Sequence, residues 1–74
     1  MLKTTTNIYI GAAYLLQGAK LVDVDRTDLK HVVYQFEGEN LDQTKSLFTT
    51  GMLYGDVKEY SQHILDLKQE LRND

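Results

Sequence analysis

The chain has 74 residues with no cysteine, proline or tryptophan, and 42% of them are hydrophobic, enough for a single small core. The absence of cysteine excludes disulfides, thiolate metal sites and a cysteine nucleophile, so packing or association must stabilise the fold. A net charge of −3 with 26% charged residues argues against disorder and against a strong phosphate-binding field.

One domain is therefore expected over residues 1–74. No apolar run approaches the roughly 20 residues of a membrane span, and residues 1–6 lack the apolar core of a signal peptide. The sequence predicts a cytoplasmic protein with no membrane partner.

The first predicted element is a helix that begins at a cap among residues 5–7 and runs to about residue 17. The segment 12–17 favours a helix, and Gly18 suits the left-handed position that follows a helix end. Ile8–Ile10 also fits a strand, because β-branched and aromatic residues favour extended backbone. Whether Ile8–Ile10 opens a strand or a helix stays open at this point.

A β-hairpin is predicted next, with strands at 20–24 and 31–36 and a polar turn between them. Apolar residues at a spacing of two are expected on one face of each strand, namely Val22, Val24, Val32, Tyr34 and Phe36. The hairpin also carries three aspartates, at 23, 25 and 28. Their spacing lacks the glycine and distal glutamate of a calcium loop, so they are interpreted as turn residues.

Two helices are predicted in the last third of the chain. Asn40 and Gln43 have the spacing of a capping box for a short helix that ends near Gly51. Asp56 and Glu59 are expected to begin a second helix of about 16 residues. Its apolar residues follow the 3, 4, 3, 4 spacing of one helical stripe, formed by Val57, Tyr60, Ile64, Leu67 and Leu71.

These elements predict an α+β fold. An N-terminal helix and two C-terminal helices are expected to pack on one face of an antiparallel β-hairpin, in the order αββαα. A two-stranded hairpin has little stability of its own and exposes two edges, so either the helices cover it or a second copy extends the sheet. A homodimer is therefore expected.

The segments Ala12–Leu21, Val32–Glu37 and Val57–Tyr60, with a late Leu67–Lys68, resemble a family of small proteins of unknown function. That family is encoded by phages and integrated elements of Gram-positive bacteria. The similarity covers about residues 6–72, but it consists of aliphatic and aromatic spacings plus one glycine, so it carries over no functional residue. The resemblance implies a compact accessory protein of a mobile element in a bacterial host.

Enzymatic and cofactor chemistry has no support in the residue pattern. The glycines form no phosphate-binding loop, and no serine lies in a nucleophile elbow. Glu59 and His63 share a helix face, but this spacing is typical of an ordinary surface pair, and His31 is expected at the rim of a strand. No catalytic residue, cofactor or metal is therefore predicted, and the chain is not expected to be an enzyme.

Nucleic-acid binding is the alternative function. The two C-terminal helices suggest a helix-turn-helix, but the last helix lacks the excess of lysine and arginine that phosphate contacts need, and the connecting loop is long. A small dimeric DNA-binding transcriptional regulator would instead use Lys20, Arg26 and Lys30 around the hairpin.

Protein–protein interaction is the predicted function. Leu65 lies off the apolar stripe of the last helix and widens its apolar surface, which favours a further contact. The candidate interaction surface consists of Tyr60, Leu65, Asp66 and Glu70, with the acidic side chains at its rim. The partner is expected to be a host or phage protein, and inhibition of a host defence system is one function that fits the mobile-element setting.

Overall fold

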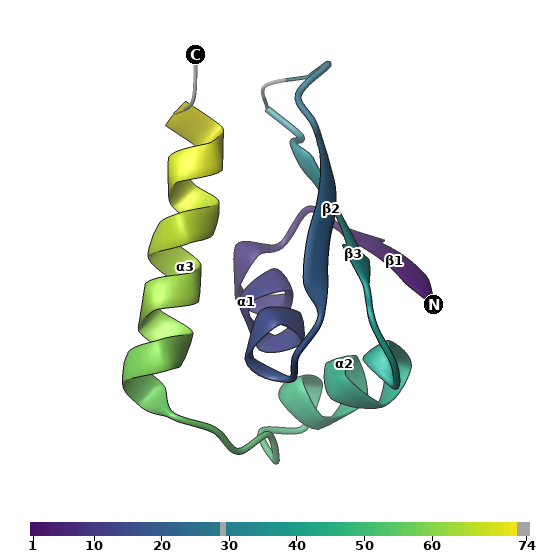
Figure 1. The fold of residues 1–74 in the computed structure, drawn as a ribbon, viewed down its shortest axis with the longest axis vertical. Helices are drawn as coiled ribbons and strands as arrows, with labels where there is room; N and C mark the ends of the chain where they lie inside the picture. Colours follow the sequence, from purple (N-terminus) through teal and green to yellow (C-terminus); the bar gives the residue numbers. More distant parts are fainter. Residues whose placement is uncertain (29, 73–74) are drawn as a thin grey trace.

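The computed structural model describes residues 1–28 and 30–72. Three helices and a three-stranded sheet follow one another in the order β1 (Leu2–Thr5), α1 (Ile8–Leu16), β2 (Lys20–Asp25), β3 (Val33–Glu37), α2 (Leu41–Thr49) and α3 (Val57–Arg72). The α+β class is confirmed, and the order of α1, β2, β3, α2 and α3 agrees with the prediction (Figure 1). No helix in the described part of the chain is long and apolar enough to cross a bilayer.

The sheet is antiparallel, and β3 is its central strand, between β1 and β2. Strand β1 was not expected from the sequence. Its four residues are too few for an alternation of polar and apolar side chains to predict a strand. They form a strand because their backbone pairs with the edge of β3, with Lys3 opposite Phe36 and Thr5 opposite Tyr34. The sheet therefore has one strand more than the predicted hairpin.

A bulge in β2 changes which residues of that strand face the core, so the prediction for this strand is wrong. Leu21 pairs with Phe36 and Asp23 pairs with Gln35, so Val22 is an extra residue without a partner on β3. The bulge shifts the alternation by one position. As a result Val24 packs on the core together with Leu21, whereas Val22 is 50% exposed. The prediction for β3 is confirmed, because Val32, Tyr34 and Phe36 are all buried.

Helix α1 lies between α3 and the sheet and is buried over four consecutive residues, Gly11–Tyr14 (Figure 1). A Cβ atom on Gly11 would lie only 2.9 Å from the Phe36 ring and 3.0 Å from Leu67, so this glycine allows α1 to approach both β3 and α3 closely. On the next turn, the Tyr14 and Phe36 rings meet edge to face with their centroids 5.4 Å apart.

The caps of α1 settle the question of its N-terminus in favour of the helix. The Asn7 carboxamide oxygen accepts hydrogen bonds from Tyr9 N at 2.8 Å and from Ile10 N at 3.3 Å. At the other end Gly18 has a φ of +96°, and Gly18 N and Ala19 N donate back to the last turn, as in a Schellman motif. The predicted helix end is confirmed.

The two C-terminal helices begin differently. The predicted capping box at Asn40 is wrong, because Asn40 adopts a left-handed φ of 59° and its side chain makes no capping hydrogen bond. Asparagine tolerates this conformation better than most residues, so the backbone geometry of the turn decides its role. The Asp56 carboxylate, by contrast, accepts from Glu59 N at 3.0 Å and caps α3 as predicted.

Helix α3 packs chiefly along α1. Tyr60, Ile64 and Leu67 of the predicted stripe contact the core, and Leu67 is fully buried. Val57 departs from the prediction because it lies at the first position of the helix, beyond the end of α1, and is 78% exposed. The Leu71 side chain lies outside the described residues.

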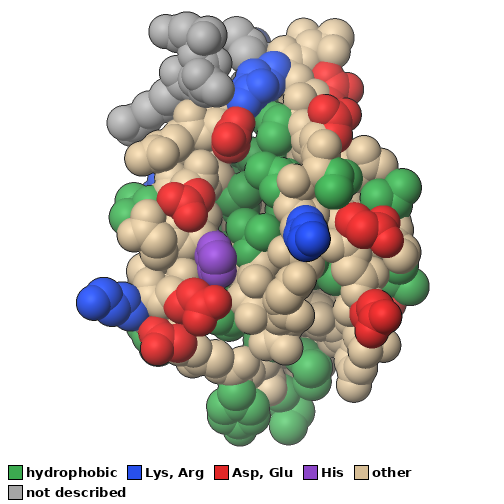
Figure 2. All heavy atoms as spheres, viewed as in Figure 1, with side chains coloured by type: hydrophobic (Ala, Val, Ile, Leu, Met, Phe, Trp, Pro, Cys, Tyr) green, Lys and Arg blue, Asp and Glu red, His purple; other side chains and the backbone are tan. Residues whose placement is uncertain are grey.

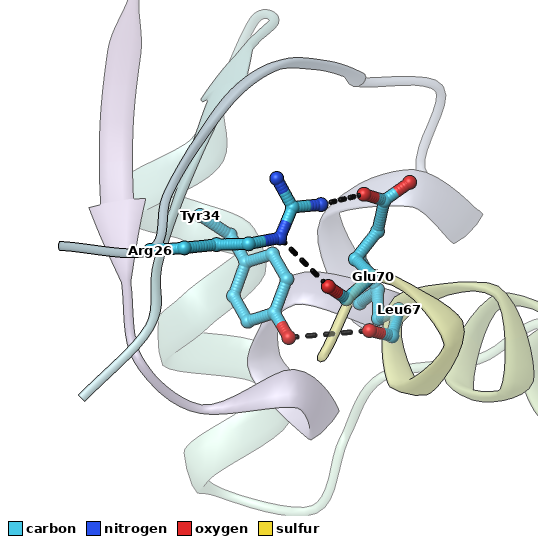
Figure 3. Close-up of polar contacts among 4 residues, drawn as sticks. All are labelled: Arg26, Tyr34, Leu67 and Glu70. Atoms are coloured by element: carbon cyan, nitrogen blue, oxygen red, sulfur yellow. Dashed lines mark hydrogen bonds and ion pairs between the residues drawn. The ribbon is translucent and has the colours of Figure 1, made fainter. Parts of the chain in front are cut away.

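Polar contacts fasten the last turns of α3 to the strands (Figure 3). The Arg26 guanidinium donates from Nε to the Glu70 carbonyl oxygen at 2.8 Å and forms an ion pair with the Glu70 carboxylate. The buried Tyr34 hydroxyl donates to the Leu67 carbonyl oxygen at 3.2 Å. We call these four residues the clamp. It joins segments more than 30 positions apart in the sequence.

Candidate functional site

An apolar hollow lies at the end of the molecule opposite the clamp. It has a volume of about 300 Å³ and lies where the end of α1, the end of α2 and the first turn of α3 meet. We call it the terminal cavity. Its lining residues are Leu16, Phe48, Gly51, Leu53, Gly55, Val57 and Tyr60.

Two glycines shape the chain around this cavity. Gly51 has a φ of +73° and ends α2, with Gly51 N donating to Phe48 O and Met52 N to Leu47 O as in a Schellman motif. Gly55 packs against Leu16, and a Cβ there would lie 2.4 Å from a methyl carbon of Leu16. The connection between α2 and α3 is thus held close to the end of α1.

Large apolar side chains at the cavity, or next in sequence to its lining residues, project into solvent. Tyr54 is 84% exposed, Val57 is 78% exposed and Met52 is 58% exposed. We call these three residues the terminal surface. Apolar residues that project from a loop beside an apolar cavity are typical of a contact surface for another macromolecule.

The cavity contains no group that is prepared for a reaction. Among the described residues that line the cavity, Tyr60 alone has a polar group on its side chain, and this hydroxyl already donates to the Tyr9 carbonyl oxygen at 3.0 Å. Burial raises the pKa of Tyr60 above its ordinary value, so the phenol stays protonated at neutral pH. Chemically, the cavity is suited to hold an aliphatic or aromatic side chain.

The residues of the predicted interaction surface have different surroundings on α3. Tyr60 lines the terminal cavity, whereas Leu65 lies five residues further along α3 and is 53% exposed. Asp66 accepts a hydrogen bond from Gln62. Glu70 belongs to the clamp, where Arg26 holds its carboxylate.

The alternative nucleic-acid contacts are also dispersed. Lys20 opens β2 and Lys30 follows its far end, and a strand of six residues separates such positions by about 20 Å. Both lysines are exposed. Arg26 lies between them in the sequence, but its guanidinium is paired with Glu70. These three cations therefore do not form one basic patch.

The remaining polar clusters have structural roles. Asp25 accepts from Thr27 N and Asp28 accepts from Lys30 N, both at 2.9 Å, which confirms these two as turn residues. For Asp23 the prediction is wrong, because Asp23 lies within β2 and pairs with Gln35. The Thr27 hydrogen bonds lower the pKa of Asp25. Glu59 and His63 form the expected surface pair, with Nε2 and Oε1 3.5 Å apart. Within residues 1–28 and 30–72, no three potential metal ligands lie together.

The sequence did not indicate Met52, Tyr54 and Val57 as one exposed surface, and it placed Val57 in the apolar stripe of the last helix. The available signal was a loop in which three apolar residues stand between two glycines, Gly51 and Gly55. A loop residue without a helix or strand periodicity gives no indication of the direction of its side chain, so exposure at this site had to come from the structure.

No protein-family model, no curated protein and no solved structure matches this chain. The resemblance to the family of phage and mobile-element proteins therefore stays a prediction.

Proposed function

We propose that this protein is a non-enzymatic interaction module that binds another protein through the terminal surface. The observation that carries the proposal is the juxtaposition of Tyr54, Val57 and Met52 with an apolar cavity of about 300 Å³. Exposed apolar side chains can insert into a partner, and a preformed apolar hollow can accept a side chain of the partner. Both features lie at the same place on this protein.

Charged side chains at the rim of this interface would orient the bound partner. Asp56, Lys58 and Glu59 lie on the first turn of α3 beside a second, shallow hollow. Rim charges of this kind change association rates and partner choice more than they change affinity. The anchoring energy would therefore come from apolar burial, and the charges would select the orientation.

The mobile-element setting predicted from the resemblance suggests the identity of the partner. It would be a host or phage protein, and inhibition of a bacterial defence enzyme is one function within this proposal. A homodimer is also retained as a proposal, with a second copy bound at the terminal surface. Light scattering measures it directly, because a mass of 8.5 kDa at high concentration contradicts a dimer.

The experiment that tests the proposed function compares three forms of the tagged protein in affinity capture from bacterial lysate. We expect the wild type to retain a protein that Tyr54→Ser loses. Tyr9→Ser is the matched control, because Tyr9 is also an exposed tyrosine but lies on the first turn of α1. A titration of the purified partner must then show the same order of affinities. Equal retention by all three forms, or no specific retention, contradicts the proposal.

The DNA-binding regulator remains the second proposal and makes a different prediction. A duplex titration at low and moderate salt should show an affinity that falls steeply with salt, because phosphate contacts release counterions. Absence of binding at tens of micromolar would dismiss it.

A further inference from the structure

The inner face of β2 is incompletely covered. Helix α1 contacts all three strands, whereas α3 packs chiefly along α1 and makes few contacts with the sheet. Leu21 and Val24 point to the core side of β2 but stay half-buried. Figure 2 shows hydrophobic side chains between α3 and β2 on this face of the molecule. We call this strip, with Leu21 and Val24 as its floor, the α3–β2 seam.

The wall of the seam on α3 is acidic. Glu59, Asp66 and Glu70 recur at intervals of seven and four residues, which places them on one face of the helix. Glu70 binds Arg26 just after the end of β2, so this face of α3 is turned towards β2. In Figure 2 acidic side chains and a histidine border the hydrophobic strip on the α3 side, and Lys or Arg side chains also adjoin the strip.

The other wall is β2, which lies at the edge of the sheet. An edge strand has a row of backbone N–H and C=O groups available to pair with a further strand. Beyond the bulge, Asp23 and Asp25 lie on the outer side of β2 and Val24 lies on its inner side. A strand placed alongside would therefore meet apolar groups on one face and carboxylates on the other.

Two kinds of strand could pair with this edge, namely β2 of a second copy of this chain or a basic segment of another protein, and charge distinguishes between them. A second copy would bring another acidic α3 and another pair of aspartates to the same place. A basic segment would instead find the carboxylates of Asp23 and Asp25 on the outer side of β2, and those of α3 along the seam. The complementarity favours the basic segment.

We propose that an extended segment of a partner protein, in which basic residues alternate with apolar ones, adds to the sheet as a fourth strand along β2. Its apolar side chains pack on Leu21 and Val24 in the α3–β2 seam. Its basic side chains lie near Asp23 and Asp25. Backbone hydrogen bonds to the edge supply affinity, and the alternation of side chains supplies specificity, as in other cases of β-strand addition.

The test uses a fluorescein-labelled octapeptide amide of alternating lysine and valine, titrated with the full chain by fluorescence anisotropy. We expect saturable binding that weakens as salt is raised. Hydrogen exchange should show new protection in β2. Two control peptides separate strand addition from simple charge attraction: one alternates glutamate and valine, and the other keeps lysine and valine but carries N-methyl groups on alternate backbone amides. The first should not bind, and the second should bind at least about tenfold more weakly because it has lost its donors.

Variants of the protein locate the site. Asp23→Lys should weaken binding of the lysine–valine peptide about fivefold, since it replaces attraction by repulsion at an exposed position. Glu39→Lys makes the same change of charge in the loop between β3 and α2 and should change the affinity less than about twofold. Circular dichroism confirms that both variants fold. Tyr54→Ser should bind the peptide as the wild type does, so this proposal and the proposed function fail independently.

Three results would overturn the inference. The first is no binding of the lysine–valine peptide up to millimolar concentration. The second is equal affinity for the N-methylated peptide, or equal losses in Asp23→Lys and Glu39→Lys, because either result reduces the interaction to non-specific charge. The third is a dimer whose mass returns to 8.5 kDa in Val22→Pro, which would assign the edge of β2 to a second copy.

Discussion

The clamp and the terminal surface lie at opposite ends of α3 and are built in opposite ways. At the clamp, polar groups find partners within the chain: Arg26 holds Glu70, and the Tyr34 hydroxyl is bonded to a helix carbonyl. At the terminal surface, Met52, Tyr54 and Val57 leave apolar area in water beside an apolar cavity.

The contrast separates residues that stabilise the fold from residues that are available for a partner. A buried hydroxyl that lost its partner would destabilise the protein, so the clamp is part of the folding unit. An exposed apolar side chain contributes little to folding, because it is as exposed in the unfolded chain as in the folded one. Substitutions at the two ends should therefore affect different measurements.

The largest loss of stability is expected in the core that underlies the clamp. Phe36→Ala removes a fully buried ring that contacts Tyr14 and Gly11, and it should lower the free energy of unfolding by about 3–5 kcal/mol. Urea denaturation followed by circular dichroism measures the loss. Met52→Ala at the terminal surface is the control, with an expected change within about 0.5 kcal/mol. Similar losses in both variants would erase the distinction between the two ends.

Alkaline pH should weaken the same core. Burial raises the pKa of Tyr34, and the negative charge of Glu70 raises it further; burial also raises the pKa of Tyr14. A raised pKa in the folded state means that the stabilising contribution is complete below the unfolded value of 10.0 and is lost as the pH rises above it.

Each such tyrosine can lower the free energy of unfolding by up to about 1.4 kcal/mol per pH unit in that range. Urea denaturation between pH 9 and 11 should show the decline. Tyr34→Phe should have a shallower slope than the wild type. A stability that does not change with pH in the wild type would contradict the prediction.

Removal of the clamp cation should have a smaller effect. Arg26→Met keeps the apolar stem but loses the bonds to the Glu70 carbonyl and carboxylate, and we expect a cost of about 1–2 kcal/mol. Glu70→Gln should cost less, because the bond from Arg26 Nε to the backbone carbonyl remains. Thermal unfolding of both variants gives the order. A larger loss in Glu70→Gln would mean that the carboxylate has another role.

The smallest effect on stability and the largest on binding are expected at the terminal surface. Tyr54→Ser should change the free energy of unfolding by less than about 0.5 kcal/mol, because its ring is almost fully exposed. The same variant should lose the captured partner. Loss of stability together with loss of binding would show that Tyr54 supports the fold, which would weaken the comparison between the two ends.

Local signals in the sequence were sufficient for most of the secondary structure. Asn7, Gly18 and Asp56 mark helix ends through hydrogen bonds and backbone conformations that depend on neighbouring residues alone. The alternation at Val32, Tyr34 and Phe36 predicted the buried face of β3 for the same reason.

The candidate site was less predictable. Tyr60 and Leu65 were named as surface residues from the helical period, but the period cannot tell which neighbour covers each side of α3. The structure shows α1 as that neighbour, with Val57 beyond its end. Glu70 was expected at a rim and is held in the clamp, because its partner Arg26 is 44 positions away in the sequence.

The sequence by itself determined the α+β class, the main helices and the central strand, since these follow from capping, glycine conformation and hydrophobic period. Only the tertiary structure decided the addition of β1, the bulge that exposes Val22 and the separation of the clamp from the terminal surface. The physical reason is that pairing, register and burial are set by contacts between residues distant in the chain. Local propensity contains no information about these contacts.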